Sequence, residues 1–129
     1  MTQLRTSTFL DAAGLVVDET SPTRLVGHIE LGPEHHTPWG IVHGGVYATA
    51  VESAASIGAS AAVADRGMVA VGLTNTTQFL RSLTEGRVVV EGTALHQGRT
   101  QQLWVVDITD QSGRLVARGE LRLQNVAAS

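Results

Sequence analysis

The alternation of apolar and polar positions predicts two groups of β-strands on either side of one long helix. Leu15–Asp18 and Arg24–Leu31 are predicted to form a strand pair, with a turn at the polar segment Glu19–Pro22. Gln111–Gly113 predicts a hairpin turn near the end of the chain. Four more segments favour strands: Val69–Leu80, Arg87–Gln97, Gln101–Thr109 and Arg114–Gln124.

The predicted helix runs from Gly44 to about Val63. This segment contains no proline and is rich in alanine with small polar residues between, and these features favour a helix. Its many Ala, Ser and Gly residues indicate close packing on several sides, because large side chains would hold neighbouring elements apart. A loop rich in Gly, Pro and His, Gly32–His43, precedes the helix.

Two strands, one helix and four strands make an α+β domain. We expect the helix to lie across a curled antiparallel sheet of five or six strands. The chain has no repeat, low-complexity tract or Pro/Gly/Ser linker, so residues 1–129 are predicted to form a single domain. A lone helix on such a sheet leaves strand edges and one helix flank uncovered, which predicts a homo-oligomer.

Composition narrows the classes of function. The chain of 129 residues has a net charge of −3 and no Lys/Arg cluster, so nucleic acid and anionic membranes are not expected partners. The absence of cysteine excludes a disulfide scaffold, a thiolate nucleophile and Cys-ligated zinc, and it fits a reducing compartment such as the cytoplasm. Met1–Leu10 lacks the pattern of a secretion signal, and no apolar run approaches the roughly 20 residues that span a bilayer.

The first candidate for chemistry is the junction of loop and helix at His43, Gly44 and Gly45. Two glycines place bare backbone N–H groups at the positive end of the helix dipole, where they can polarise a carbonyl oxygen. A thioester carbonyl would suit this place. From the glycines alone, a plain turn into the helix is the more common explanation.

Glu52 is the second candidate, because it lies in mid-helix among apolar and small residues such as Val51 and Ala54. A carboxylate is costly to bury there without a reason. An ordinary carboxyl is ionised at neutral pH, and it can attack a carbonyl or take a proton from water. For an isolated glutamate, a solvent-facing position is the more common explanation. Ser56, one turn later on the same face, could hold a water beside Glu52 or could be a small residue in close packing.

The spacing of these candidates predicts a shared site. Gly44 and Glu52 are eight residues apart, which is about 12 Å along one helix. One thioester cannot contact both of them in a single chain. If both act together, the helices of two subunits run antiparallel, and Gly44 of one subunit meets Glu52 of the other.

Metal-dependent chemistry is not expected. His35 and His36 are adjacent, and His28, His43 and His96 are scattered without an HExxH spacing. His43 could contact a ligand or bond back to the loop. The chain also lacks a Walker A loop, a Rossmann fingerprint and a G-x-S-x-G elbow, so no cofactor is predicted.

Five segments match a known pattern: Trp39–Ser56, Ala70–Gly72, Asn75–Ser82, Glu85–Val88 and Gly113–Leu115. Together they resemble the glutamate-dependent acyl-CoA thioesterases of the hotdog fold, in the phenylacetic-acid-degradation-type superfamily. The most similar patterns are those of 4-hydroxybenzoyl-CoA thioesterases and of the 1,4-dihydroxy-2-naphthoyl-CoA thioesterases of menaquinone biosynthesis. The resemblance implies a long central helix wrapped by the sheet, and hydrolysis of an aromatic acyl-CoA to the free acid and CoA.

The resemblance also implies roles for individual residues. The Gly44 amide would polarise the thioester carbonyl, and Glu52 of the partner chain would act as nucleophile or general base. Ser56 would position water, and His43 would set the loop at the site. Contacts to the substrate and to the phosphates of CoA would come from Gly45, Arg81, Arg99 and Thr100. The family further implies dimers with shared active sites, which pair into a homotetramer.

Two departures from the family pattern concern the site. Thr37 stands where the family usually has Gln or Asn to assist at the carbonyl, and its hydroxyl could substitute through water. Arg99 replaces a smaller residue and could add a phosphate contact. Two other functions remain open. A hotdog hydratase or dehydratase needs a His paired with an acid on another segment, and a non-catalytic acyl-CoA-binding protein normally carries an effector domain.

Overall fold

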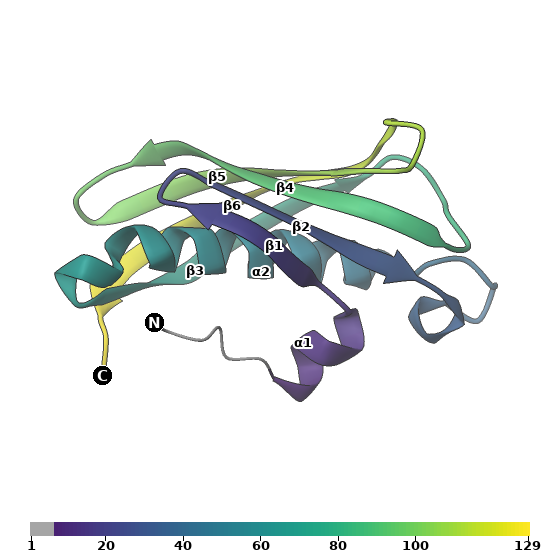
Figure 1. Ribbon diagram of the computed structural model, residues 1–129, viewed down its shortest axis with the longest axis horizontal. Coiled ribbons are helices and arrows are strands. Elements are labelled where there is room, and N and C mark those ends of the chain that lie inside the picture. Colours follow the sequence, from purple (N-terminus) through teal and green to yellow (C-terminus); the bar gives the residue numbers. More distant parts are fainter. Residues whose placement is uncertain (1–6) are drawn as a thin grey trace.

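The computed structural model describes residues 7–129, which form one long helix under one six-stranded sheet (Figure 1). Residues 1–6, which belong to the segment expected to carry no secretion signal, lie outside the described residues. The helices are α1 (Thr8–Ala13) and α2 (Gly44–Val63), with the 3-10 turns η1 (Pro33–His35) and η2 (Ala64–Arg66). The strands are β1 (Val16–Ser21), β2 (Arg24–Leu31), β3 (Met68–Phe79), β4 (Gly86–Gln97), β5 (Gln101–Thr109) and β6 (Leu115–Ala127).

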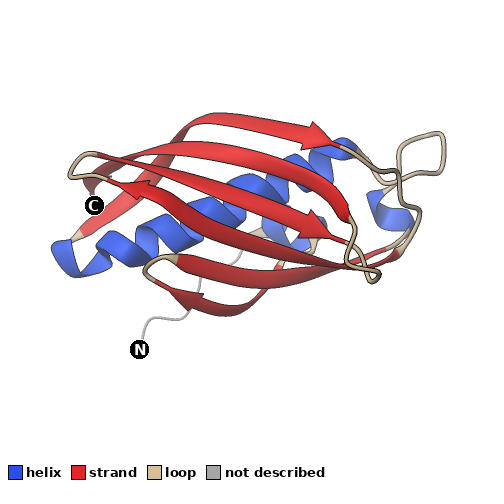
Figure 2. Cartoon of the chain, turned by 90° about the horizontal axis from the view of Figure 1, so that it is seen from above, coloured by secondary structure: helices blue, strands red, loops and turns tan. Residues whose placement is uncertain are grey.

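All neighbouring strands of the sheet are antiparallel, in the order β1-β2-β4-β5-β6-β3. The sheet curls over α2, which crosses its concave side (Figure 2). This arrangement confirms the predicted α+β class and the hotdog fold. Among residues 7–129, no helix is both long and apolar enough to cross a membrane.

The small residues of α2 set how closely the helix approaches the sheet. A Cβ on Gly58 would lie 2.7 Å from the ring of Trp104, so glycine is needed there for the indole to contact the helix backbone. Trp104 is fully buried, and burial of one large apolar side chain stabilises a fold by roughly 1.5–3 kcal/mol. The buried residues of α2 are Tyr47, Ala50, Val51, Ala54, Ala55, Gly58, Ala59 and Val63.

The first hairpin differs from the prediction at its turn. The sequence predicts a turn at Glu19–Pro22, but β1 continues to Ser21, and the chain turns at Pro22 and Thr23. A bulge between Val17 and Glu19 lets the strand continue after its register shifts. Polar residues here mark an exposed strand rather than a turn.

The helix α1 was not predicted. Its N-terminus is capped by Ser7, whose Oγ accepts a hydrogen bond of 3.1 Å from the Leu10 N–H, and it ends at Gly14 with φ 85°. Ser before a helix and Gly after it are both typical caps, but six residues are too few to show a helical period. Ala13 is buried, and Phe9 remains 71% exposed.

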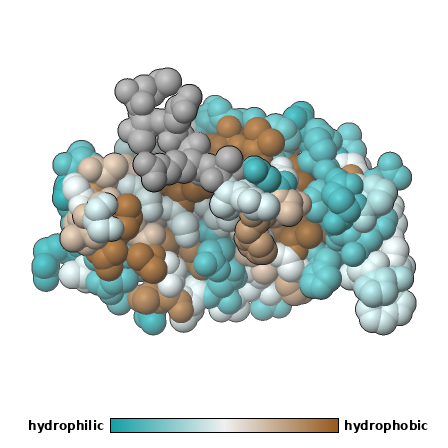
Figure 3. All heavy atoms as spheres, turned by 90° about the horizontal axis from the view of Figure 1, so that it is seen from below, coloured by the Kyte–Doolittle hydropathy of each residue, from teal (hydrophilic) through white to brown (hydrophobic). Residues whose placement is uncertain are grey.

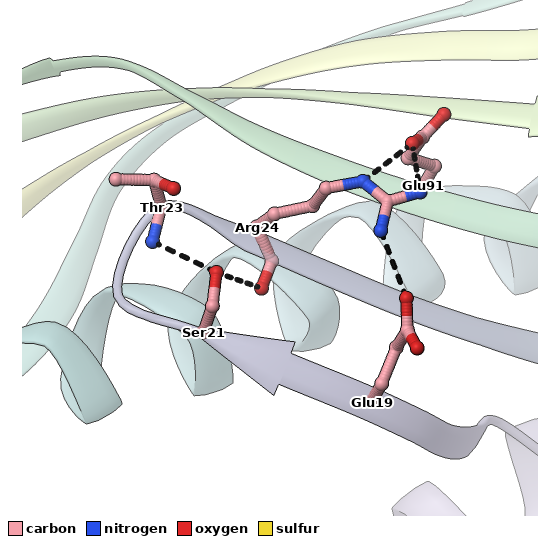
Figure 4. Close-up of polar contacts among 5 residues, drawn as sticks. All are labelled: Glu19, Ser21, Thr23, Arg24 and Glu91. Atoms are coloured by element: carbon pink, nitrogen blue, oxygen red, sulfur yellow. Dashed lines mark hydrogen bonds and ion pairs between the residues drawn. The ribbon is translucent and has the colours of Figure 1, made fainter.

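Cross-strand ion pairs cover the outer face of the sheet. Arg24 of β2 pairs with Glu19 of β1 at 2.9 Å and with Glu91 of β4 at 2.6 Å (Figure 4). Hydrogen bonds to Glu91 and then to Glu19 raise the pKa of Arg24. Arg118 of β6 pairs with Asp107 of β5 at 2.6 Å. These arginines are therefore engaged in ion pairs on the outer face of the sheet.

Candidate active site

His43 fixes the N-terminal end of α2. Its Nδ1 accepts a hydrogen bond of 2.8 Å from the Gly45 N–H, and its carbonyl accepts one of 3.0 Å from the Val46 N–H. Because Nδ1 accepts this hydrogen bond, Nε2 is the ring nitrogen of His43 that is left to donate. A Cβ on Gly45 would lie 2.9 Å from His43 Nδ1. Glycine at position 45 therefore makes room for this cap.

The N–H of Gly44 is a backbone donor at this end of the helix that the His43 cap does not use. Its N–H donates to no other residue within 7–129, whereas those of Gly45 and Val46 are taken by His43. A Cβ on Gly44 would lie 3.1 Å from Cζ of Phe79, so glycine also permits the close contact with that ring. Gly44 is half-buried and lines neither of the two clefts described below, but its N–H, without a partner among the described residues, lies at the positive end of the helix dipole.

Glu52 projects from the middle of α2 over the edge strand β3. Its Oε2 lies 3.6 Å from the position that a Cβ would take on Gly72 of β3. The side chain is exposed, and its carboxylate forms no hydrogen bond or ion pair with any residue of the described part of the chain. A carboxylate without a partner can act on a substrate as nucleophile or base.

Two clefts join the start of α2 to Glu52. A cleft of about 350 Å³ has Glu52 in its wall, and a cleft of about 390 Å³ reaches His43 and Gly45. Both clefts share Phe9 and Thr49 as wall residues. Figure 3 views the helix side of the molecule, on which apolar side chains are exposed between polar ones. The remaining wall residues of the cleft at Glu52 are Ala48, Ser53 and Asn75.

Asn75 connects the two elements of the cleft wall, α2 and β3, through hydrogen bonds. Its Nδ2 donates to the Ala48 carbonyl at 3.0 Å, and its Oδ1 accepts from the Thr77 hydroxyl at 2.6 Å. The bond to Ala48 joins β3 directly to α2 one turn before Glu52. The carboxylate therefore stands on a rigid wall rather than on a loop.

Ser56 and Thr37 lie outside the walls of the two clefts. Ser56 is half-buried one turn after Glu52, and Ser53 rather than Ser56 lines the cleft. The Thr37 hydroxyl accepts a hydrogen bond of 3.2 Å from the Trp39 N–H and closes a local turn. Neither Ser56 nor Thr37 is among the wall residues of the two clefts.

The predicted CoA contacts fall at opposite ends of α2. Arg81 follows the end of β3, close to the Phe79 ring that covers Gly44. Arg99 and Thr100 form the β4–β5 turn, which lies at the other end of the helix. With 20 residues, α2 is about 30 Å long. One chain therefore does not bring Arg81 and Arg99 to the same ligand phosphate.

Two observations limit the chemistry of this region. No group of three or more His, Asp or Glu side chains in residues 7–129 is arranged to hold a metal ion. Tyr47 is buried one turn after Gly44, with its ring centroid 6.4 Å from that of Phe79, and its hydroxyl has no hydrogen-bond partner among the described residues. Burial raises the pKa of Tyr47, so the phenol stays protonated and does not serve as a base.

Phe9, Ser53 and Asn75 are among the wall residues of the cleft at Glu52 that were not found from the sequence. Asn75 had a weak signal, because it opens a polar run in the middle of a predicted strand. Ser53 gave none, since serine recurs throughout α2. Phe9 gave none either, because α1 was not predicted.

The chain is similar to known proteins over most of its length. The profile of the family described as the thioesterase superfamily matches residues 40–117, which include both Gly44 and Glu52. A Mycobacterium tuberculosis protein whose name describes it as an esterase, Rv1847, is 43% identical over 117 residues, covering 89% of this chain and 84% of that protein. The structure of Rv1847 superimposes with a TM-score of 0.91 at 41% identity, covering 95% of this chain and 99% of that one.

Two further relatives extend the comparison. A Listeria monocytogenes protein named 1,4-dihydroxy-2-naphthoyl-CoA hydrolase is 30% identical over 106 residues, covering 82% of this chain and 85% of that protein. The crystal structure of AziG from S. sahachiroi superimposes with a TM-score of 0.91 at 38% identity, covering 95% of this chain and 99% of that one. Both similarities cover more than four fifths of this chain.

Proposed function

Because the chain belongs to the thioesterase superfamily and is a thioester hydrolase, we propose that it hydrolyses an aromatic acyl-CoA of the hydroxybenzoyl or dihydroxynaphthoyl kind. The observation that carries the proposal is Glu52, a carboxylate without a partner in a cleft beside β3. Small side chains and the ring of Phe9 line this cleft, and such walls favour a flat aromatic group. The relative named as a naphthoyl-CoA hydrolase supports the same class of substrate.

Glu52 acts on the thioester carbonyl in one of two ways. As nucleophile, its oxygen attacks the carbonyl carbon, CoA leaves as the thiolate, and water then cleaves the resulting anhydride. As general base, it takes a proton from a water whose oxygen attacks the carbonyl carbon, and that proton passes to the departing thiolate. Both routes yield the free acid and CoA without any cofactor.

The start of α2 stabilises the charge that forms on the carbonyl oxygen. The Gly44 N–H donates to this oxygen, and a single donor of this kind contributes about 10²–10³-fold in rate. His43 and Gly45 hold the helix terminus in place through the cap. Ser56 holds the attacking water, and Thr37, whose hydroxyl accepts from the Trp39 N–H and can still donate, assists through water.

One thioester reaches both Gly44 and Glu52 only when two copies of the chain pair. The edge strand β3 contains no charged residue and exposes Val69, Val71 and Leu73. Antiparallel pairing of two β3 strands would continue the sheet and set two α2 helices side by side in opposite directions. Gly44 of one copy then faces Glu52 of the other, and each dimer has two shared sites.

The same pairing explains the position of the proposed CoA contacts. Arg81 lies at the Gly44 end of α2, and Arg99 with Thr100 lies at the other end, so opposed copies bring the two groups to one ligand. Guanidinium groups suit the phosphates of CoA. A tetramer of two such dimers stays a prediction from the family resemblance.

The experiment is release of free CoA from benzoyl-, hydroxybenzoyl-, dihydroxynaphthoyl-, phenylacetyl- and straight-chain acyl-CoA esters by the wild type, Glu52→Gln and Glu120→Gln. Glu120 is an exposed carboxylate on β6 outside the clefts, and its variant is the matched control. We expect aryl esters to be preferred, Glu52→Gln to lose about 10²–10⁴-fold in kcat, and Glu120→Gln to match the wild type. No CoA release by the wild type, or full activity of Glu52→Gln, would refute the proposal.

A further inference from the structure

Two buried amide side chains lie near the C-terminal end of α2, away from Glu52. Gln102 of β5 is 1% exposed and Asn125 of β6 is 5% exposed. Gln102 Nε2 donates to Asn125 Oδ1 at 2.8 Å. Burying a polar group costs free energy unless the group is hydrogen-bonded. The hydrogen-bond partners of Gln102 and Asn125 therefore indicate the role of this pair.

Gln102 anchors the pair to the helix and to the core. Its Nε2 also donates to the Ala59 carbonyl of α2 at 3.1 Å. Its Oε1 accepts from Trp104 Nε1 at 2.9 Å and from Gln97 Nε2 at 3.1 Å. Every polar atom of this side chain is therefore in use, and its position relative to α2 is fixed.

Asn125 donates hydrogen bonds to three carbonyl groups of the β4–β5 turn. Its Nδ2 lies 3.4 Å from the Gly98 carbonyl oxygen and 3.3 Å from that of Arg99, two long bonds made by one amide group. Its backbone N–H donates to the Thr100 carbonyl at 2.8 Å. Three consecutive carbonyls of the turn are thus directed inward, toward one residue.

The groups of the β4–β5 turn that face away from Asn125 are suited to binding an anion. The N–H groups of Arg99 and Thr100 donate to no residue of the described chain, and both side chains are exposed. Arg66 of η2 donates Nη2 to the Arg99 carbonyl at 3.1 Å. Two guanidinium groups and two free N–H groups therefore lie at this turn, and such sets bind phosphate.

We infer that Asn125 is a positioning residue for CoA, and that Arg66 is a further phosphate-binding side chain. This inference rests on the proposed binding of CoA by Arg99 and Thr100. By holding the three carbonyls inward, Asn125 keeps the N–H groups and the guanidinium of Arg99 turned toward the phosphates. The role concerns binding rather than chemistry, because Gln102, which holds Asn125, bonds α2 at Ala59, about two turns beyond Glu52.

The test compares one aryl group carried as its CoA ester and as its pantetheine thioester, which lacks the nucleotide and its phosphates. For Asn125→Ala, we expect KM for the CoA ester to rise about tenfold with kcat unchanged, and kcat/KM for the pantetheine ester to stay at the wild-type value. For Arg66→Gln, an exposed residue, we expect a rise of about fivefold for the CoA ester alone. Arg87→Gln, which removes an equal charge at the opposite end of β4, is the control and leaves both esters unchanged.

Equal losses on both esters would show that Asn125 only supports the fold, and an unchanged KM for the CoA ester in both variants would overturn the inference. Asn125→Ser is the second variant if Asn125→Ala does not fold, and Arg66→Gln decides if neither folds. Calorimetric binding of CoA itself separates this inference from the proposed reaction. If the wild type cleaves no aryl thioester but both variants weaken CoA binding, the proposed reaction fails and the inference stands.

Discussion

The two edges of the sheet are built in opposite ways. β1 has six residues and carries Asp18 and Glu19, whereas β3 has 12 residues and no charge. Both strands contain a bulge, so length and charge make the difference. Short, charged edge strands resist pairing with another chain, and long apolar edge strands favour it. By this criterion β1 is a closed edge, which resists pairing with a second copy of the chain, and β3 is an open edge, which favours it.

The open edge is also the edge beside the candidate carboxylate. Glu52 stands over Gly72 of β3, and the neighbouring Val69, Val71 and Leu73 are 38%, 48% and 47% exposed. At the other edge, Asp18 bonds His28 at 2.7 Å and Glu19 bonds Arg24 at 2.9 Å. The proposed interface and the candidate active site therefore fall on one surface, so a change that blocks the proposed pairing should also abolish hydrolysis.

The same substitution at the two edges gives the largest expected contrast. Val71 and Val16 are 48% and 50% exposed on β3 and β1 respectively. Val71→Lys buries one charge per copy in the proposed interface, at a cost of about 1.5 kcal/mol each, so the dimer dissociation constant should rise about 10²-fold. We expect a monomer by light scattering at micromolar concentration, with a comparable loss of aryl-CoA hydrolysis.

Val16→Lys is the matched control, and it should keep both the mass and the activity of the wild type. A β3 variant that remains a fully active dimer would contradict the comparison. A β1 variant that dissociates would assign the interface to the other edge.

Mixing two inactive variants tests whether each site is shared. Gly44→Val displaces the Phe79 ring and covers the N–H, since even a Cβ there would lie 3.1 Å from that ring. Glu52→Ala removes the carboxylate. In a randomly exchanged mixture, half of the dimers are mixed, and each of these has one site with both Gly44 and Glu52 intact. Activity should therefore recover to about a quarter of the wild-type value.

The recovery is measured after the two variants are unfolded and refolded together, with the separately refolded variants as controls. A site contained in a single chain gives no recovery at any ratio. Recovery above the sum of the separate variants requires that residues of two chains meet.

Long segments with a strong pattern account for what the sequence predicts well. The predicted helix bounds agree with α2, since about 20 residues of small, helix-favouring side chains leave little choice. Glu52 was found because a carboxylate is conspicuous among alanines. The cleft around it was not found, because Phe9 and Asn75 come from segments far away in the sequence. The neighbour of β3 was not predictable either, since pairing with β6 depends on how the whole sheet closes over α2.

The smallest effect is expected from Arg24→Gln, which tests whether the ion pairs of Arg24 help to close the β1 edge. The substitution leaves Glu19 and Glu91 without their shared cation. Exposed ion pairs contribute little to stability, so Tm should fall by only a few degrees at low salt, and less at about 1 M NaCl, where screening acts within about 3 Å. Arg118→Gln, which breaks the pair with Asp107, is the control on the same face. Unchanged mass and activity would show that the ion pairs of Arg24 are not needed to keep the β1 edge closed, whereas assembly through β1 would show that they are.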